Sequence, residues 1–111
     1  MLNIAQNDMG IYYKFDMIDA SGLPINLVNS KVHIRLFRPD GKVKEIDSVD
    51  DNSHLVILDE DDGVCQYTIQ STDTDIEGIY TMYVSVINSN FNITAEKNLQ
   101  YCVYAEKGSE A

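Results

Sequence analysis

The chain has 111 residues, enough for one domain with a single core and too few for two. It carries 18 Asp and Glu against 8 Lys and Arg, a formal charge of −10. A surface this negative repels phosphate backbones and anionic lipids, so we expect neither nucleic acid nor a membrane as a partner. No run reaches the ~18 apolar residues that span a bilayer, and the N-terminus lacks the regions of a secretory signal. Both observations favour a soluble intracellular product, unless a leader has been removed.

The two cysteines, Cys65 and Cys102, are predicted to be free thiols. Strand alternation places Cys65 on the same face as Tyr67, where it would act as a small buried hydrophobe. It places Cys102 on the face opposite to Tyr101. A reducing compartment favours thiols, and a disulfide stays open as the alternative.

The first seven residues are expected to form an N-terminal arm, residues 8–104 the single domain, and residues 105–111 a flexible C-terminal tail. Leu2 and Ile4 are apolar but have no obvious position in a core. Terminal arms of this kind can become ordered on docking, so these two residues are candidate contacts with another protein.

Apolar and polar residues alternate with a period of two along most of the chain, and turn residues interrupt the alternation at short intervals. In the stretch KVHIRLF, Val32, Ile34 and Leu36 alternate with charged or polar residues, as in a half-buried strand. Further strands are predicted at 10–19, 43–46, 55–58, 64–69, 79–87, 91–94 and 99–104. About eight strands in a chain of this length predict two packed antiparallel sheets.

The stretch MIDASGLPINL interrupts the first of these strands. Residues 20–22 reverse the chain, and Pro24, which has no N–H to donate, suits the edge of a sheet. Ile25 and Leu27 can then enter the gap between the sheets at the end of the sandwich. We interpret this stretch as a core plug and a sheet-crossing segment.

Several short segments have the composition of turns. RPDG has Pro39 to preset φ and Gly41 to accept a positive φ, so it predicts a hairpin tip. DEDDG, at 59–63, predicts a charged hairpin turn that ends at a glycine. TDTDIEG is the candidate for a single helical turn, with Thr72 or Asp73 as its cap.

No catalytic constellation is recognisable. His33 lies between charged positions on a strand and His54 in a polar loop, and neither has a Cys or Ser neighbour spaced as a nucleophile pair. The chain has no glycine-rich phosphate loop and no zinc pattern. Aligning Gly63 with the glycine of a calcium-binding loop puts Leu58 at the first ligand position, which breaks that pattern. We expect no enzyme, no cofactor and no metal site, and only a weak calcium site stays open.

Tyr12, Tyr83 and Tyr104 lie on the less apolar faces of their strands. Outward tyrosines of this kind often cover a protein interface, where a rigid amphipathic ring is useful. The alternative is a platform on which a sugar stacks. The outward face of 79–87 also carries Ile79 and Ile87, so this strand is either covered or presented to a partner. We favour the interface.

The order of these motifs resembles that of a known family. The motif D-x-S-G-x-P-I-x-L comes first and is followed by an alternating strand that ends in R-P-D-G-K. An acid-rich turn and a strand with Y-T-I come next. The motif D-x-x-x-x-G-x-Y then leads into a long strand. This order is similar to the N-terminal domain of the phage baseplate upper protein family, over roughly residues 8–104. The residues that carry the resemblance are Asp19, Gly22, Pro24, Leu27, Pro39, Asp40, Gly41, Gly63, Tyr67, Gly78 and Tyr80.

The resemblance implies an all-β fold, an antiparallel immunoglobulin-like β-sandwich of about 7–9 strands. In that pattern the Tyr80 hydroxyl hydrogen-bonds an upstream backbone group, although Met82 replaces the expected cysteine. The resemblance also implies a virion protein made in the cytoplasm of the host bacterium. Family members continue into a helical linker and a further domain, whereas this sequence ends at YAEKGSEA. A stand-alone accessory protein and a shortened one both stay open.

One functional hypothesis and two alternatives follow. The first is a non-enzymatic structural module of a tailed phage, in the tail, baseplate or neck, that docks to other virion proteins as a symmetric homo-oligomer. A head decoration protein would share the fold and differ in its place on the particle. A small carbohydrate-binding module that attaches to host glycan is the alternative from another class, and it requires exposed, coplanar tyrosines over a shallow groove.

Overall fold

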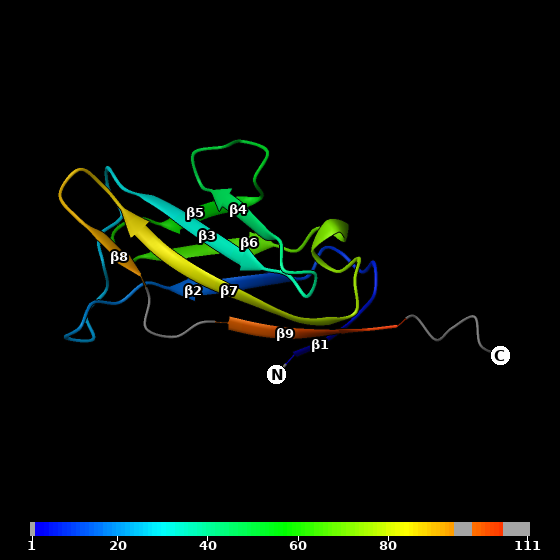
Figure 1. Ribbon diagram of the computed structural model, residues 1–111. Helices are drawn as coiled ribbons and strands as arrows, with labels where there is room; N and C mark the ends of the chain where they lie inside the picture. The colour runs from blue at the N-terminus through cyan, green and yellow to red at the C-terminus, as the bar shows by residue number, and fades with distance from the viewer. Residues whose placement is uncertain (1, 95–98, 106–111) are drawn as a thin grey trace.

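A computed structural model of the protein describes residues 2–94 and 99–105 (Figure 1). These residues form nine strands and one short 3-10 helix, and they contain no α-helix, so the predicted all-β fold is confirmed. The elements are β1 (Leu2–Ala5), β2 (Tyr12–Asp16), β3 (Lys31–Phe37), β4 (Val43–Asp47), β5 (Leu55–Asp59), β6 (Val64–Thr68), η1 (Ser71–Asp73), β7 (Gly78–Ile87), β8 (Asn92–Thr94) and β9 (Leu99–Tyr104).

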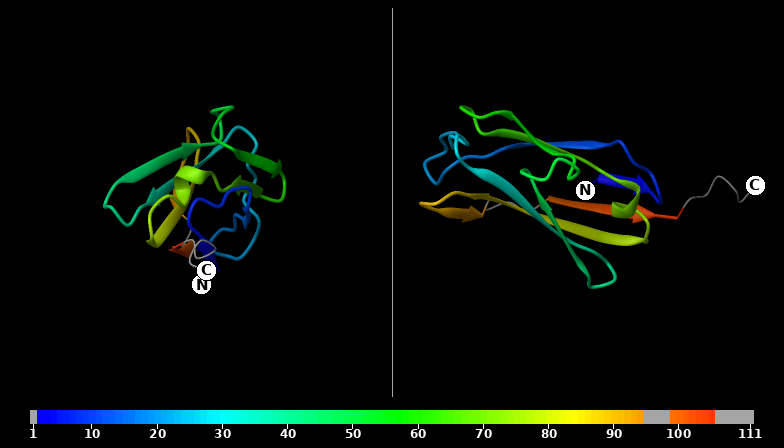
Figure 2. Two further views of the ribbon diagram at one scale, coloured as in Figure 1. Left: turned by 90° about the vertical axis from the view of Figure 1, so that its right-hand side faces the viewer. Right: turned by 90° about the horizontal axis from the view of Figure 1, so that it is seen from above.

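The strands form two sheets that pack face to face (Figure 2). The larger sheet has the order β1-β9-β7-β3-β4. β8 pairs with the last residues of β7. It lies on the same side of β7 as β9, which pairs with the first residues of that strand. The smaller sheet has the order β2-β6-β5 and is antiparallel. The long strand β7 is therefore central, as its two apolar faces indicate.

The core lies between the sheets and consists of the inward residues of the alternating strands. The inward side chains of β3 and β7 are at most 2% exposed; they are Val32, Ile34, Leu36, Tyr80, Met82, Val84 and Val86. Cys65 and Tyr67 from β6 pack against them and are fully buried. Both cysteines are free, as predicted.

The sequence does not foresee strand β1. It predicts an arm without a core position, but Leu2–Ala5 pairs with β9, and Ile4 is only 2% exposed. Ile4 is therefore part of the core and is not an available contact, whereas Leu2 stays 44% exposed. Four residues are too few to show a period of two, which is why the pattern misses this strand. The β1–β9 pair is parallel, so the larger sheet is mixed rather than purely antiparallel. Residues 106–111 of the expected tail lie outside the described residues.

The stretch from Met17 to Leu27 closes one end of the sandwich. Pro24 lies at an isolated antiparallel bridge, and the Asp19 carboxylate accepts two backbone N–H groups of the turn, at 2.8 and 3.0 Å. Ile25 and Leu27 are 8% and 1% exposed, so the predicted core plug is confirmed. We call residues 17–27 the apolar plug.

The predicted turns are present, with one correction. Gly41 has a φ of 83° at the RPDG tip, and Gly63 has a φ of 69° at the end of the acidic turn. Thr72 and Asp73 do not cap the helical turn but lie inside it, and Gln70 is the cap residue. The reason is that the Asp73 carboxylate reaches back and accepts the Gln70 N–H at 2.9 Å, as in a capping box.

Candidate docking surfaces and the polar hub

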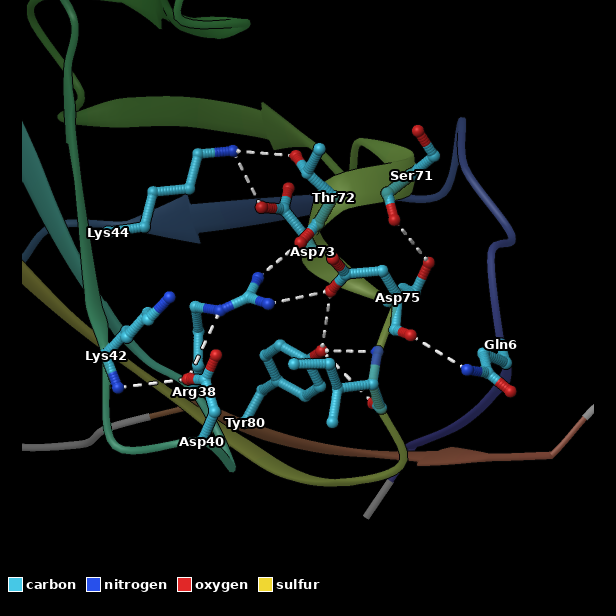
Figure 3. A network of polar contacts seen from close by, with 12 residues as sticks. Gln6, Arg38, Asp40, Lys42, Lys44, Ser71, Thr72, Asp73, Asp75 and Tyr80 are labelled. Carbon is cyan, nitrogen blue, oxygen red and sulfur yellow. Dashed lines mark hydrogen bonds and ion pairs between the residues drawn. The ribbon is translucent and has the colours of Figure 1, made fainter.

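Residues 70–76, which we call the polar hub, lie at the end of the sandwich opposite to the apolar plug (Figure 1) and form a network of polar contacts (Figure 3). Hydrogen bonds from Tyr67 and Tyr101 join them to the two sheets. Asp73 is fully buried, and its carboxylate accepts hydrogen bonds from the Tyr67 hydroxyl and the Gln70 N–H. The Lys44 ammonium of β4 pairs with the same carboxylate at 2.7 Å. A buried carboxylate is costly without such partners, so these contacts hold the hub in place.

Three buried tyrosines from both sheets end at the polar hub. Besides Tyr67, the Tyr101 hydroxyl donates to the Asp73 carbonyl at 2.8 Å. The Tyr80 hydroxyl donates to the carbonyl of Ile76 at 3.1 Å, which confirms the predicted bond to an upstream backbone group. The rings of Tyr80 and Tyr101 stack with their centroids 4.9 Å apart. Burial, and then the charge of Asp73, raise the pKa of Tyr101, and burial and the Asp73 hydrogen bond raise that of Tyr67. Both hydroxyls therefore stay neutral donors.

Arg38, directly after β3, holds the polar hub from outside. Its side chain is 13% exposed, and its Nη2 lies 2.8 Å from Asp75 Oδ1. Its Nη1 donates to the Thr72 carbonyl, and the guanidinium lies 5.8 Å from the centre of the Tyr80 ring. Burial alone would lower the pKa of Arg38, but the hydrogen bond and charge of Asp75 outweigh it and raise this pKa.

The segment that follows β1 is also bound to the polar hub. Gln6 Nε2 donates to the Asp75 carbonyl at 2.8 Å, and the Asn7 N–H donates to the Thr74 carbonyl at 2.9 Å. The Thr74 hydroxyl donates to the Asp8 carbonyl at 2.6 Å. The hub thus fastens β3, β4, β6, β7, β9 and the N-terminal segment together, and its polar groups act as a structural clamp.

The motif residues of the sequence resemblance occupy turns and core positions. Asp19 and Asp40 accept backbone N–H groups within their turns. Gly78 packs so closely against Pro39 that an added Cβ would lie 2.8 Å from the proline ring. Four glycines of the motif have positive φ; they are Gly22, Gly41, Gly63 and Gly78. Three other members are buried; they are Leu27, Tyr67 and Tyr80. These residues specify the fold rather than a common surface.

The candidate interface tyrosines do not share one surface. Tyr12, 62% exposed, lies on the outer face of the smaller sheet, whereas Tyr83 and Tyr104 lie on the outer face of the larger sheet. Since Val103 pairs with Gly78, Tyr104 lies about 20 Å from Tyr83 along the sheet. The three rings therefore do not form a single stacking platform for a sugar.

The structure instead brings Tyr83 together with residues that the sequence analysis does not single out. The Phe37 and Tyr83 rings meet edge to face, with centroids 5.3 Å apart, and the Arg35 guanidinium lies 5.7 Å from the Phe37 centroid. With Thr81 and Ser85 they line a shallow depression of about 400 Å³. One signal was present: the alternation that turns Leu36 inward also turns the aromatic Phe37 outward.

The histidines lie where solvent-facing histidines are expected. His33 Nε2 is 3.3 Å from Glu45 and Nδ1 is 3.8 Å from Asp47, on the outer face of the larger sheet. His54 is exposed in its loop. Within residues 2–94 and 99–105, no group of three or more His, Cys, Asp or Glu side chains is arranged to hold a metal ion. The same part of the chain has no helix with the length and apolar character of a membrane span.

No protein-family model matches this chain, and no curated protein is significantly similar to it in sequence. Among solved structures, the N-terminal domain of phage TP901-1 ORF48 is similar to it, with a TM-score of 0.64. The alignment covers 93% of this chain and 83% of that chain, at 16% sequence identity. Identity this low shows a shared fold, which extends over nearly the whole chain.

Proposed function

We propose that the protein is a non-enzymatic structural module of a tailed-phage particle, in the tail, baseplate or neck, and that it docks to other virion proteins. The observation that carries this proposal is the structural similarity, over 93% of the chain, to a domain of a phage protein. The motif order supports membership of the baseplate upper protein family. The backbone hydrogen bond of Tyr80 supports an immunoglobulin-like sandwich, in which a tyrosine near the start of the sixth strand makes this bond.

The side chains support contact rather than chemistry. Asp73 and Arg38, the best-buried charged residues named above, are engaged in internal contacts. The exposed side chains include aromatic rings such as Tyr83 and Tyr12, and aromatic residues are enriched at protein interfaces. The sugar-binding alternative requires coplanar tyrosines, and the division of Tyr12 and Tyr83 between opposite faces does not favour it.

The test is to locate the chain on purified particles. Particles from the native source are banded on a density gradient, and mass spectrometry measures the ratio of this chain to known tail proteins. We expect a fixed ratio across the particle peak, and gold-labelled antibody against the chain at the tail. As a control, recombinant protein is added to particles of a phage from which its gene has been deleted. The amount that bands with these particles measures non-specific adsorption.

Two outcomes would change the assignment. Antibody label on the capsid would make the protein a head decoration module. Absence of the chain from particles, together with retention on purified host cell-wall glycan, would overturn the virion proposal in favour of a carbohydrate-binding module.

A further inference from the structure

We propose that the outer face of the larger sheet is a self-association surface, on which a second copy of this chain docks about a two-fold axis. We call this surface the β3–β7 face and define it by the outward residues of β4, β3 and β7, with Phe37 and Tyr83 at its centre. The proposal goes beyond the proposed function, because pairing of the pure protein needs no other virion protein.

The β3–β7 face has an apolar centre of several side chains. Phe37 and Tyr83 are both 37% exposed, and Val43 and Ile79 are 41% and 51% exposed. The register places Val43 beside Phe37 across β3–β4, and Thr81 beside Phe37 across β3–β7. The centre therefore extends over β4, β3 and β7, three strands that are adjacent in the sheet (Figure 1). An apolar patch with a polar rim is the usual composition of an interface.

The charge of this face favours a second copy as the occupant. In the described strands of the larger sheet, the outward charged residues are two cations, Lys31 and Arg35, and two anions, Glu45 and Asp47. The cations lie 2.9 Å and 3.5 Å from the anions, in the pairs Lys31–Asp47 and Arg35–Glu45. The face is therefore neutral, whereas the chain has a charge of −10. Two copies repel each other least when their neutral faces meet.

Area separates this face from the outer face of the smaller sheet. The smaller face carries one cation, Lys14, against two anions, Asp16 and Asp59, and its three short strands present only about 250 Å². By the same measure, the outer face of the whole larger sheet presents about 500 Å² and the β3–β7 face about 350 Å², so two copies bury about 700–1,000 Å², the size of a weak interface. A two-fold axis makes every contact twice, and the depression beside Tyr83 can receive a ring from the other copy.

Sedimentation equilibrium of the purified full chain, from about 1 µM to about 1 mM, tests the proposal. We expect a monomer–dimer equilibrium with a Kd between about 10 µM and 1 mM, as for other interfaces of this size. The dimer should be tighter at about 500 mM than at about 50 mM salt, because salt screens the repulsion between two negatively charged chains. An equilibrium that weakens at high salt, or a chain that stays monomeric throughout, would overturn the proposal.

Two pairs of charge-matched variants locate the contact. Arg35→Glu on the β3–β7 face and Lys14→Glu on the opposite face change the net charge equally, and both side chains are exposed. Tyr83→Asp and Tyr12→Asp form the second pair. We expect the β3–β7 variants to weaken association at least tenfold, and the controls to match the wild type. Equal weakening by the two members of both pairs would refute this face. Neither result bears on the phage assignment, which is tested separately by the ratio of this chain to known tail proteins in purified particles.

Discussion

At one end of the sandwich, the polar hub brings a buried carboxylate, three tyrosine hydroxyls and two cations into contact. At the other end, hydrocarbon from Ile25 and Leu27 fills the gap between the sheets. The hydrogen bonds that join the plug to the acidic turn at 59–63 are made between backbone groups: the Met17 N–H donates to the Gly63 carbonyl at 2.8 Å, and the Leu27 N–H donates to the Glu60 carbonyl at 2.7 Å. Both ends hold loops from the two sheets together, but different groups do so.

The difference concerns what each end loses when one group is removed. The contribution of the apolar plug scales with buried area and packing, so a smaller side chain removes it in part. The polar hub depends on complete pairing, because a buried charge or hydroxyl without its partner retains its full desolvation cost. Titration should therefore act mainly at the hub, and steric changes mainly at the plug.

The largest expected effect of a substitution is that of Asp73→Ala. The change leaves the buried Tyr67 hydroxyl and the Gln70 N–H without their acceptor and removes the ion pair to Lys44, whose side chain is 34% exposed, so we expect a loss of about 3–5 kcal/mol. Urea unfolding followed by circular dichroism measures this loss. Asp75→Ala is the control, because Asp75 is 42% exposed and water can replace its contacts. Equal losses for the two variants would contradict the assignment of a buried charge at the hub.

High pH should destabilise the protein through the hub. The pKa values of Tyr67 and Tyr101 are raised in the fold, so between the ordinary value of about 10 and the folded value the native state holds protons that the unfolded chain releases. The stability that these groups contribute is complete below pH ~10 and falls above it, by up to about 1.4 kcal/mol per pH unit for each group. Burial also raises the pKa of Cys65 to about 12, so the stability that this thiol contributes likewise falls as the pH rises above about 9.

The free energy of unfolding in urea at pH 8, 10 and 11 tests this prediction. Tyr67→Phe is the matched variant, since it removes one titrating hydroxyl and keeps the ring. It should be less stable than the wild type at pH 8 but lose less stability between pH 10 and 11. Parallel pH profiles for the two proteins would show that Tyr67 does not contribute to alkaline unfolding.

Gly63→Ala tests the plug end by steric means. Gly63 has a φ of 69°, and an added Cβ would lie 2.6 Å from the Ile25 carbonyl oxygen and 2.7 Å from that of Met17. Both atoms belong to backbone that forms the plug, so we expect a loss of about 2–4 kcal/mol. Gly41→Ala is the control, because Gly41 also has a positive φ but its Cβ would meet open space, which costs about 1 kcal/mol. A similar loss in both variants would show that φ, and not the close approach, sets the cost.

The sequence predicts the plug end better than the hub end, and the reason is the range of the contacts. Gly22 and Pro24 shape a local turn, so turn chemistry predicts them, and the apolar character of Ile25 and Leu27 beside that turn indicates that they enter the core. The ion pair between Lys44 and Asp73, in contrast, joins residues 29 positions apart. No local pattern marks such a pair, so the sequence does not show that Asp73 is the buried centre of the polar hub.

The same limit explains the surface that the sequence analysis leaves out. Alternation along each strand identifies Phe37 and Tyr83 as outward residues. It does not place β3 beside β7, and their rings meet only because Arg35 pairs with Tyr83 in that sheet. Ile4 is missed for a related reason: its parallel partner Val103 lies at the other end of the chain. Strand order is a property of the whole fold, and the motif resemblance supplied the fold class without these neighbours.

The smallest of these effects is expected for Tyr80→Phe. The hydroxyl donates to the Ile76 carbonyl and accepts the Ile76 N–H at 3.2 Å, both neutral groups, and the exposed Asp75 carboxylate is farther away, at 3.4 Å. The ring stays stacked on Tyr101. A neutral hydrogen bond contributes about 1 kcal/mol, and a smaller ring substituent leaves no large cavity, so the urea midpoint should shift only slightly. Tyr12→Phe, on the exposed outer face, should leave the midpoint unchanged. If Tyr80→Phe costs as much as Asp73→Ala, the charge of Asp73 is not what distinguishes the polar hub from the plug, and its stability derives from the network of tyrosine hydroxyls as a whole.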